Sequence, residues 1–172
     1  MEYTHVTHTF EPVFDENSEI LILGSFPSVK SRENQFYYGH PQNRFWKVLG
    51  HLFDCDIPVT IEEKVSFLHV NHVAVWDVIQ TCDIVGSSDS SIKNVVGNDM
   101  DVILKKAQIR KIFVNGDKAY KLFLKYCKKE GQPPLVKLPS TSPANAAWSL
   151  ERLTAQWQKE MGTALSGMEK GE

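Results

Sequence analysis

The chain has few cysteines, a net charge near zero and no long hydrophobic run. Its three cysteines, Cys55, Cys82 and Cys127, lie far apart, with no CxxC pair and no Cys/His cluster. This spacing argues against a disulfide framework and against the common zinc and iron–sulfur ligand sets. We expect the thiols to be reduced, as in a cytosolic or nuclear protein. No apolar run approaches the length that spans a membrane.

The N-terminal segment lacks the features of a targeting sequence. "MEYTHVTHTFEPVF" has neither a basic n-region nor an apolar h-region. We therefore expect a soluble protein without a membrane partner, cytoplasmic and nucleoid-associated in a bacterium or nuclear in a eukaryote. His5 and His8 are spaced like weak metal ligands but lack carboxylate or cysteine support, so we predict no metal and no cofactor. The net charge of −2 requires a local basic patch for any anionic partner.

Four short apolar runs are separated by helical patterns. With 172 residues, the length favours one domain over 1–172, in which 1–15 and 162–172 are expected to be peripheral or frayed. The predicted strands cover 19–24, 72–76, 111–116 and 134–140. The predicted helices cover 43–53, 60–68, 117–127 and 142–157. This alternation predicts an α/β fold, a three-layer α/β/α sandwich around a central, mainly parallel four-stranded sheet.

Ligands of such folds bind at the carboxyl ends of the strands, which directs attention to the segments after each strand. The first strand is followed by "GSFPSVKSRENQFYYGHPQNRFW", a long connection stiffened by prolines and therefore typical of a functional loop. The fourth is followed by Ser140, Thr141 and Ser142, just before a predicted helix that has Pro143 in its first turn. Hydroxyls and free amides at such a place are typical phosphate ligands.

The motifs in these two segments resemble those of a known family. "LGSFPS", "HPQNRFWKVLG" and "LPSTSPANA" resemble the motif regions of the uracil-DNA glycosylase superfamily, over roughly residues 20–157. Together with "WDVI" and "GSSDSSI", they are closest to its hypoxanthine-DNA (deoxyinosine) glycosylase branch. The resemblance implies a uracil-DNA glycosylase-like fold and DNA containing deaminated bases as the partner. A monomer suits that role.

Two positions depart from the superfamily pattern. Phe26 stands where most branches carry an Asn or Asp that positions the attacking water, and Leu138 stands where several carry a His or Asn that contacts the base. The resemblance to the hypoxanthine branch then implies Asn43 as the catalytic residue. Its carbonyl would accept a hydrogen bond from water, and His40 is a further catalytic candidate. Asn43 can equally cap the helix that follows it, and the two roles are compatible.

Enzymes of this kind extrude the target base into a pocket and stack it on a ring. Tyr37, Tyr38 and Phe26 are the candidate stacking residues, although both tyrosines can also be core residues. Backbone amides around Ser25 and Phe26 can bind the base carbonyl. Asp77 is a turn or cap residue in one interpretation and contacts the base or water in another.

The remaining candidates concern the DNA backbone. Phosphate contacts are predicted for the hydroxyls and the lysine that flank the two motifs, namely Ser28, Lys30, Ser31, Ser140, Thr141 and Ser142. Arg44 is expected to be a salt-bridge or phosphate partner rather than a catalytic group.

The resemblance, with these residues in their motif positions, implies a monofunctional DNA glycosylase that removes hypoxanthine first and uracil second, in base excision repair. No lysine occupies a motif position where it would supply lyase chemistry. Three alternatives remain open: a mismatch-specific uracil/thymine-DNA glycosylase, a catalytically idle nucleic-acid-binding module of the same fold, and a hydrolase acting on a small nucleotide.

Overall fold

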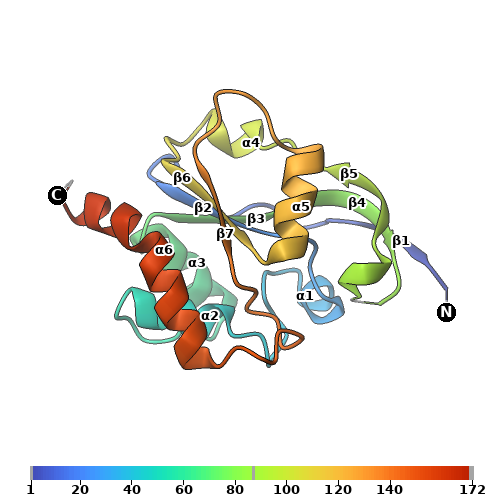
Figure 1. The fold of residues 1–172 in the computed structure, drawn as a ribbon, viewed down its shortest axis with the longest axis horizontal. Helices are drawn as coiled ribbons and strands as arrows, with labels where there is room; N and C mark the ends of the chain where they lie inside the picture. The colour runs from blue at the N-terminus through green and yellow to red at the C-terminus, as the bar shows by residue number, and fades with distance from the viewer. Residues whose placement is uncertain (1, 87, 171–172) are drawn as a thin grey trace.

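The computed structural model describes residues 2–86 and 88–170, and a parallel sheet forms its centre (Figure 1). The sheet contains β2 (Ile20–Gly24), β3 (Val73–Asp77), β6 (Lys111–Asn115) and β7 (Leu135–Leu138), in the order β3-β2-β6-β7. All three strand pairs are parallel. Every residue of β2 and β3 is buried, as expected for strands that are covered on both faces. The four predicted strands are confirmed.

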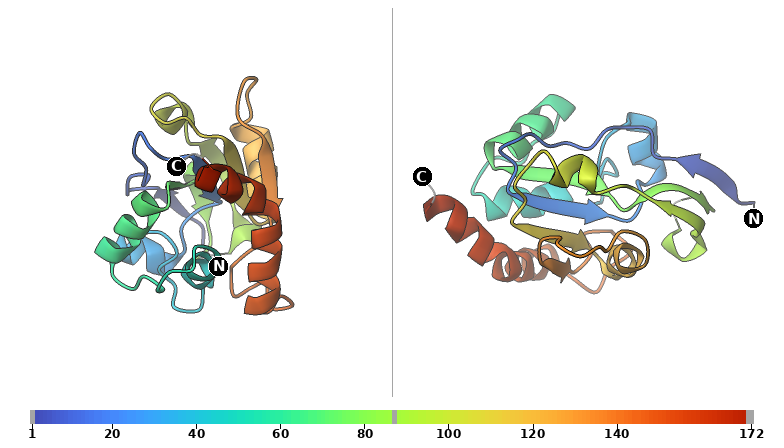
Figure 2. Two further views of the ribbon diagram at one scale, coloured as in Figure 1. Left: turned by 90° about the vertical axis from the view of Figure 1, so that its left-hand side faces the viewer. Right: turned by 90° about the horizontal axis from the view of Figure 1, so that it is seen from above.

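Helices cover the two faces of this sheet, which confirms the three-layer prediction. On one side lie α1 (Val29–Asn34), α2 (Phe45–Leu52) and α3 (Ile61–Val70), and on the other lie α5 (Asp117–Tyr126) and α6 (Leu150–Lys170) (Figure 2). The short α4 (Asp101–Leu104) precedes β6. Helix α3 begins with the capping box of Thr60 and Glu63, in which each side chain bonds the other residue's backbone amide.

A second, antiparallel sheet was not predicted. It contains β1 (Thr4–Thr7), β4 (Ile79–Ile84) and β5 (Lys93–Gly97), in the order β1-β4-β5, with the 3-10 turn η1 (Asp89–Ser91) between β4 and β5. A single residue, Val78, separates β3 from β4, so the chain passes directly from one sheet into the other. These strands mix exposed and buried residues without a long apolar run, which is why the sequence pattern missed them.

The N-terminal segment is more integrated than expected. β1 pairs with β4, and Val13 forms a bridge with Val75 of β3. Residues 4–13 are therefore paired with both sheets, although β1 itself is a mostly exposed edge strand. At the other end, α6 continues to Lys170, and Gly171 and Glu172 lie outside the described residues.

The last helix begins later than predicted. Its first residue is Leu150, and Ser149 accepts a hydrogen bond from the backbone amide of Arg152. The preceding segment, 139–149, is a loop of turns, in which Asn145 N–H donates to the carbonyl of Ser142 and Trp148 N–H to that of Asn145. The prediction of a helix from Pro143 is therefore wrong, and no helix N-terminus lies directly behind Ser140, Thr141 and Ser142.

None of the helices within the described ranges is long and apolar enough to cross a membrane. Cys82 and Cys127 are buried, Cys55 is exposed, and all three thiols are free. Burial raises the pKa of the Cys127 thiol to about 11, so it stays protonated and behaves as a small core residue.

Candidate active site

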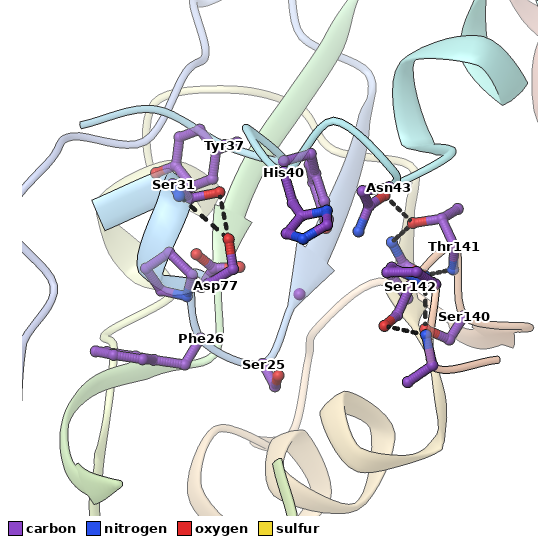
Figure 3. A pocket seen from close by; sticks show the side chains of 17 residues that line it. Ser25, Phe26, Ser31, Tyr37, His40, Asn43, Asp77, Ser140, Thr141 and Ser142 are labelled. Atoms are coloured by element: carbon purple, nitrogen blue, oxygen red, sulfur yellow. Dashed lines mark hydrogen bonds between the residues drawn. The ribbon is translucent and has the colours of Figure 1, made fainter. Parts of the chain in front are cut away.

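The carboxyl ends of all four parallel strands line one cavity of about 360 Å³. Gly24 ends β2, Asp77 ends β3, Asn115 ends β6, and Ser140 follows β7 by two residues. The long connection after β2 forms another wall with His40 and Asn43 (Figure 3), and Tyr38 of the same connection also lines the cavity. The structure thus brings together most of the residues singled out from the sequence, at the place that the strand-end rule predicts.

The first part of the long loop is held by two serines. The Ser28 hydroxyl caps α1 by accepting from Ser31 N–H at 3.1 Å, and the Ser31 hydroxyl accepts from Gly39 N–H at 2.8 Å. Ser31 is only 1% exposed. The predicted phosphate contact of Ser31 is therefore wrong, because its hydroxyl is buried and engaged within the loop. Lys30 is exposed, lies 3.7 Å from Glu33, and does not line the cavity.

Asn43 has a defined amide orientation. Its Oδ1 accepts from the backbone N–H of Phe45 at 3.0 Å and from the Thr141 hydroxyl at 2.8 Å. Since a backbone N–H can only donate, the atom that faces it is the carbonyl oxygen, and Nδ2 points the other way. Both lone pairs of Oδ1 are thus in use. The hypothesis that this carbonyl accepts from water does not fit the geometry, and the group left to act in the cavity is the Nδ2 donor.

Thr141 links Asn43 to the end of β6. Its hydroxyl accepts from Asn115 Nδ2 at 3.0 Å while donating to Asn43, and its backbone N–H donates to Asn115 Oδ1 at 3.1 Å. Thr141 is fully buried. A phosphate contact by this residue is therefore excluded, and its role is to orient Asn43. Asn115 was not singled out from the sequence, because its part in this chain of hydrogen bonds depends on a contact 26 residues away.

Arg44 fastens the loop 139–149 to α2. Its guanidinium donates to the backbone carbonyls of Thr141, Ser142, Asn145 and Trp148. A planar fork of five N–H groups suits such a set of acceptors. The expectation of a salt bridge or phosphate contact is wrong for Arg44. Its bonds also explain the late start of α6, because they occupy carbonyls that a helix beginning at Pro143 would use.

Replacing Arg44 with lysine is expected to lower the free energy of unfolding by about 2 kcal/mol, because an ammonium group cannot reach four diverging carbonyls. Urea unfolding followed by circular dichroism measures this difference. Lys47→Arg on the same helix serves as the control, since Lys47 is exposed. An unchanged midpoint for Arg44→Lys would show that the four contacts contribute nothing net.

The two remaining motif serines shape the loop while lining the cavity. The Ser140 hydroxyl accepts from Ser142 N–H, and the Ser142 hydroxyl accepts from Ala144 N–H, both at 3.1 Å. Both residues are partly exposed, so each hydroxyl can still donate outward. Gly116 packs directly against Ser140, where a β-carbon would lie 3.1 Å from the Ser140 β-carbon.

The three aromatic candidates occupy different environments. Tyr37 is 1% exposed, donates its hydroxyl to the Glu11 carbonyl at 2.8 Å and packs on Phe10, so it is chiefly a core residue with one edge at the cavity. Tyr38 has a left-handed backbone (φ 52°) and stacks on Phe45, with ring centroids 3.8 Å apart. Phe26 is half-buried beside the Arg32 guanidinium, and its ring points away from His40 and Asn43 in Figure 3.

The Tyr38 hydroxyl has an unusual environment. Its oxygen is buried, and no described residue offers it a hydrogen bond within normal limits. Asn115 lies close enough to influence its pKa, yet both ends of that amide are bonded to Thr141. Burial, reinforced by the negative charge of Asp77, raises the pKa of Tyr38. The hydroxyl therefore stays protonated and can donate a hydrogen bond.

His8 was not expected at the site. It follows β1, and its Nε2 lies 2.8 Å from Oδ2 of Asp77, with both side chains at most 4% exposed. The His8 ring packs against Phe10 and Tyr37, at centroid distances of 4.4 and 5.8 Å. The contact joins residues 69 positions apart, and nothing in the local sequence indicates it. Within the described ranges, no group of three or more His, Cys, Asp or Glu side chains is arranged to hold a metal.

His40 also has an assignable orientation. Its Nδ1 accepts from the backbone N–H of Gln42 at 3.1 Å, so the neutral ring carries its proton on Nε2. The ring lines the cavity close to Asn43, whose backbone N–H donates to the His40 carbonyl (Figure 3). The cavity thus presents two side-chain N–H donors from one short segment.

A comparison with protein-family models decides the family. Residues 11–161 match the model described as the uracil DNA glycosylase superfamily. The chain belongs to this superfamily. The match begins within the N-terminal segment and ends in α6, so it includes every strand of the parallel sheet and both motif loops.

Individual relatives of this superfamily member cover most of its length. It is 37% identical over 153 residues to a hypoxanthine DNA glycosylase of Methanosarcina acetivorans, covering 87% of this chain and 94% of that protein. A hypoxanthine DNA glycosylase of Methanosarcina barkeri is 36% identical over 112 residues, 64% of this chain and 71% of its own. A solution NMR structure from M. acetivorans, a candidate uracil DNA glycosylase by its description, superimposes with a TM-score of 0.71 at 36% identity, over 87% of this chain and 92% of that one.

Proposed function

We propose that this protein is a monofunctional DNA glycosylase that takes a deaminated base, hypoxanthine first and uracil second, out of DNA and hydrolyses its N-glycosidic bond. The observation that carries the proposal is the cavity at the strand ends, where the Asn43 amide and His40 present N–H donors beside a buried carboxylate. The family and the names of the two Methanosarcina relatives support the same chemistry. A cavity of this size suits one flipped base.

The reaction adds a water oxygen to C1′ of the sugar while the base leaves with the electrons of the broken C–N bond and gains a proton. Because the sugar is already cationic in the transition state, the attacking water needs orientation more than a strong base. Asn43 Nδ2 holds this water through one of its lone pairs and leaves the other free to attack. The Nε2–H of His40 faces the departing base and stabilises its negative charge.

The DNA backbone is held around the mouth of the cavity. Ser28, Ser140 and Ser142 line the cavity and remain candidates for phosphate contacts, and Lys30 on the exposed face of α1 supplies a positive charge nearby. No lysine is among the described residues that line the cavity. Without an amine to form a Schiff base, the product is an intact abasic site. As a separate part of the proposal, the enzyme acts as a monomer.

Single-turnover assays on duplexes that carry inosine, uracil or a thymine mispair test this function. We expect inosine and, more slowly, uracil to be excised, with strand breaks that appear only after alkaline treatment. Breaks without alkali would contradict the monofunctional assignment. Binding to all three duplexes without an abasic product would favour the idle module. Hydrolysis of free inosine with little dependence on salt would favour a nucleotide hydrolase, since a DNA enzyme weakens steeply as salt increases.

A further inference from the structure

Positive charge is concentrated in one part of the chain. Residues 102–140 contain ten of the 19 lysines and arginines but two of the 21 aspartates and glutamates, so this segment carries a formal net charge of +8 and the rest of the chain −10. By contrast, the segments 29–70 and 150–170, which hold α1 to α3 and α6, each contain equal numbers of acidic and basic residues. The segment 102–140 therefore supplies the local basic surface that a chain of net charge −2 needs to bind a polyanion.

A row of four of these lysines runs along α5. Lys118, Lys121 and Lys125 are three and four residues apart, which places them on one side of the helix, opposite its buried residues. Lys128 continues the row beyond the helix end, where its backbone N–H bonds the carbonyl of Phe123. Lys118 is partly exposed, and the other three are exposed. We call these four lysines the α5 stripe.

The α5 stripe has little compensating negative charge. Asp117, at the start of α5, lies 2.9 Å from Lys121 and 3.3 Å from Lys137 of the edge strand β7, so one carboxylate is shared by two ammonium groups. Within the part of the chain that the structure describes, no acidic side chain forms an ion pair with the other three lysines of the stripe. Like charges three and four residues apart weaken a helix, so the stability of α5 does not explain the row.

The α5 stripe begins beside the cavity. Asn115, at the end of β6, lines the cavity, and the next residue, Gly116, caps α5 and packs against Ser140. From there α5 runs away from the strand ends, because it connects the parallel strands β6 and β7 (Figure 1). Its ten residues extend about 15 Å, the length of about four base pairs of duplex DNA. The stripe thus leads from the serines that are candidates for phosphate contacts onto one flank of the molecule.

We propose that the α5 stripe is a second, sequence-independent DNA-binding surface, which holds the phosphate backbone next to the cavity while the enzyme searches for a damaged base. The inference rests on the proposed function, since it presupposes that the cavity acts on DNA. Lysine side chains are compact point charges that neutralise phosphates without reading bases. Because such contacts release counterions, they strengthen binding to any duplex and let a protein slide along it.

Two features favour a DNA backbone over an acidic protein as the partner of the stripe. The stripe is continuous with the edge of the cavity, where a DNA substrate of the proposed enzyme has to lie. It also consists of lysines alone, in a regular row, which suits evenly spaced phosphates. Recognition of individual carboxylates on a protein favours the planar fork of arginine, and the stripe contains no arginine.

Neutralising three lysines of the stripe tests the proposal. We expect the combined variant Lys118→Gln, Lys121→Gln and Lys125→Gln to bind an undamaged duplex about tenfold or more weakly at low salt in fluorescence anisotropy. The slope of log affinity against log salt concentration should become shallower by about two to three. In single-turnover excision of inosine, the loss should raise the half-saturating enzyme concentration rather than lower the saturating rate. Arginine at the same three positions should restore most of the affinity, since it keeps the charge.

The chain offers a control with the same change in net charge. Lys47→Gln, Lys93→Gln and Lys159→Gln together remove three exposed lysines from α2, β5 and α6, and should change the affinity less than twofold. An equal loss in this control would mean that total charge matters rather than the stripe, and would overturn the proposal. Glutamine is a good helix former, so both variants should keep the wild-type circular dichroism.

Unchanged affinity and salt slope in the stripe variant would also overturn the proposal, and would leave the stripe to solvent or to an acidic protein. The excision assay distinguishes this failure from failure of the proposed function. If wild-type protein excises no base from any of the duplexes, the function is wrong. If it excises inosine but the stripe variant binds DNA as tightly as wild type, the error concerns the stripe alone.

Discussion

Replacing Asn43 with aspartate is expected to lower the single-turnover rate of inosine excision by about a hundredfold or more, although the two side chains have nearly the same shape. A carboxylate at this position still accepts from Phe45 N–H and from the Thr141 hydroxyl, so the local structure is kept. The second atom becomes an oxygen, which can no longer donate into the cavity. The loss therefore reports the missing Nδ2 donor together with the added negative charge, and Asn43→Ala, which removes the amide without adding a charge, should also be impaired.

The opposite result has a clear meaning. If Asn43→Asp retains most of the activity while Asn43→Ala loses it, the residue acts as an acceptor or base toward water, and the amide would have to turn over in the complex. If both variants are active, Asn43 only supports the start of α2. Asn71→Asp is a suitable control, because the Asn71 amide bonds the Phe67 carbonyl at the end of α3 and lies outside the cavity.

The parallel sheet was predictable because its strands are buried on both faces. β2 and β3 are continuous apolar runs, and this pattern marks a strand without any knowledge of its neighbours. The strands of the second sheet have one exposed face and irregular pairing between β4 and β5, so their local pattern is weak. The start of α6 was missed for a different reason: Arg44, about a hundred residues earlier, holds the carbonyls of the preceding loop.

In the site, too, features that depend on the local sequence were predictable, and features that depend on contacts between distant residues were not. Asn43, His40 and Tyr38 lie in one motif segment, and the rule of strand ends was enough to place them at the cavity. Their orientations were not predictable, because they depend on Thr141 and Asn115, which arrive from β7 and β6. His8 could not be found from the sequence, since a histidine just after a short polar strand gives no sign that it will contact Asp77.

Gly24→Ala is the second substitution with a large expected effect. A β-carbon at this position would lie 2.6 Å from Asp77 Oδ1 and 2.9 Å from the Tyr38 hydroxyl, closer than nonbonded atoms allow. Neither neighbour yields easily, since Asp77 is bonded to His8 and the Tyr38 ring is stacked on Phe45. We expect a loss of about a hundredfold or more in single-turnover excision, together with about 1–3 kcal/mol in the free energy of unfolding.

A second glycine distinguishes the loss of excision that is specific to the cavity from the general effect of adding a methyl group. Gly162→Ala in α6 meets no atom within 4 Å, so it should leave excision unchanged and raise stability by about 0.5–1 kcal/mol. If Gly24→Ala excises inosine at the wild-type rate, Asp77 and Tyr38 can move aside without any effect on excision, and the close contact at Gly24 is not required for activity. A folded Gly24→Ala that still binds DNA but no longer excises would place the damage at the base itself, since backbone contacts around the mouth of the cavity do not involve Gly24.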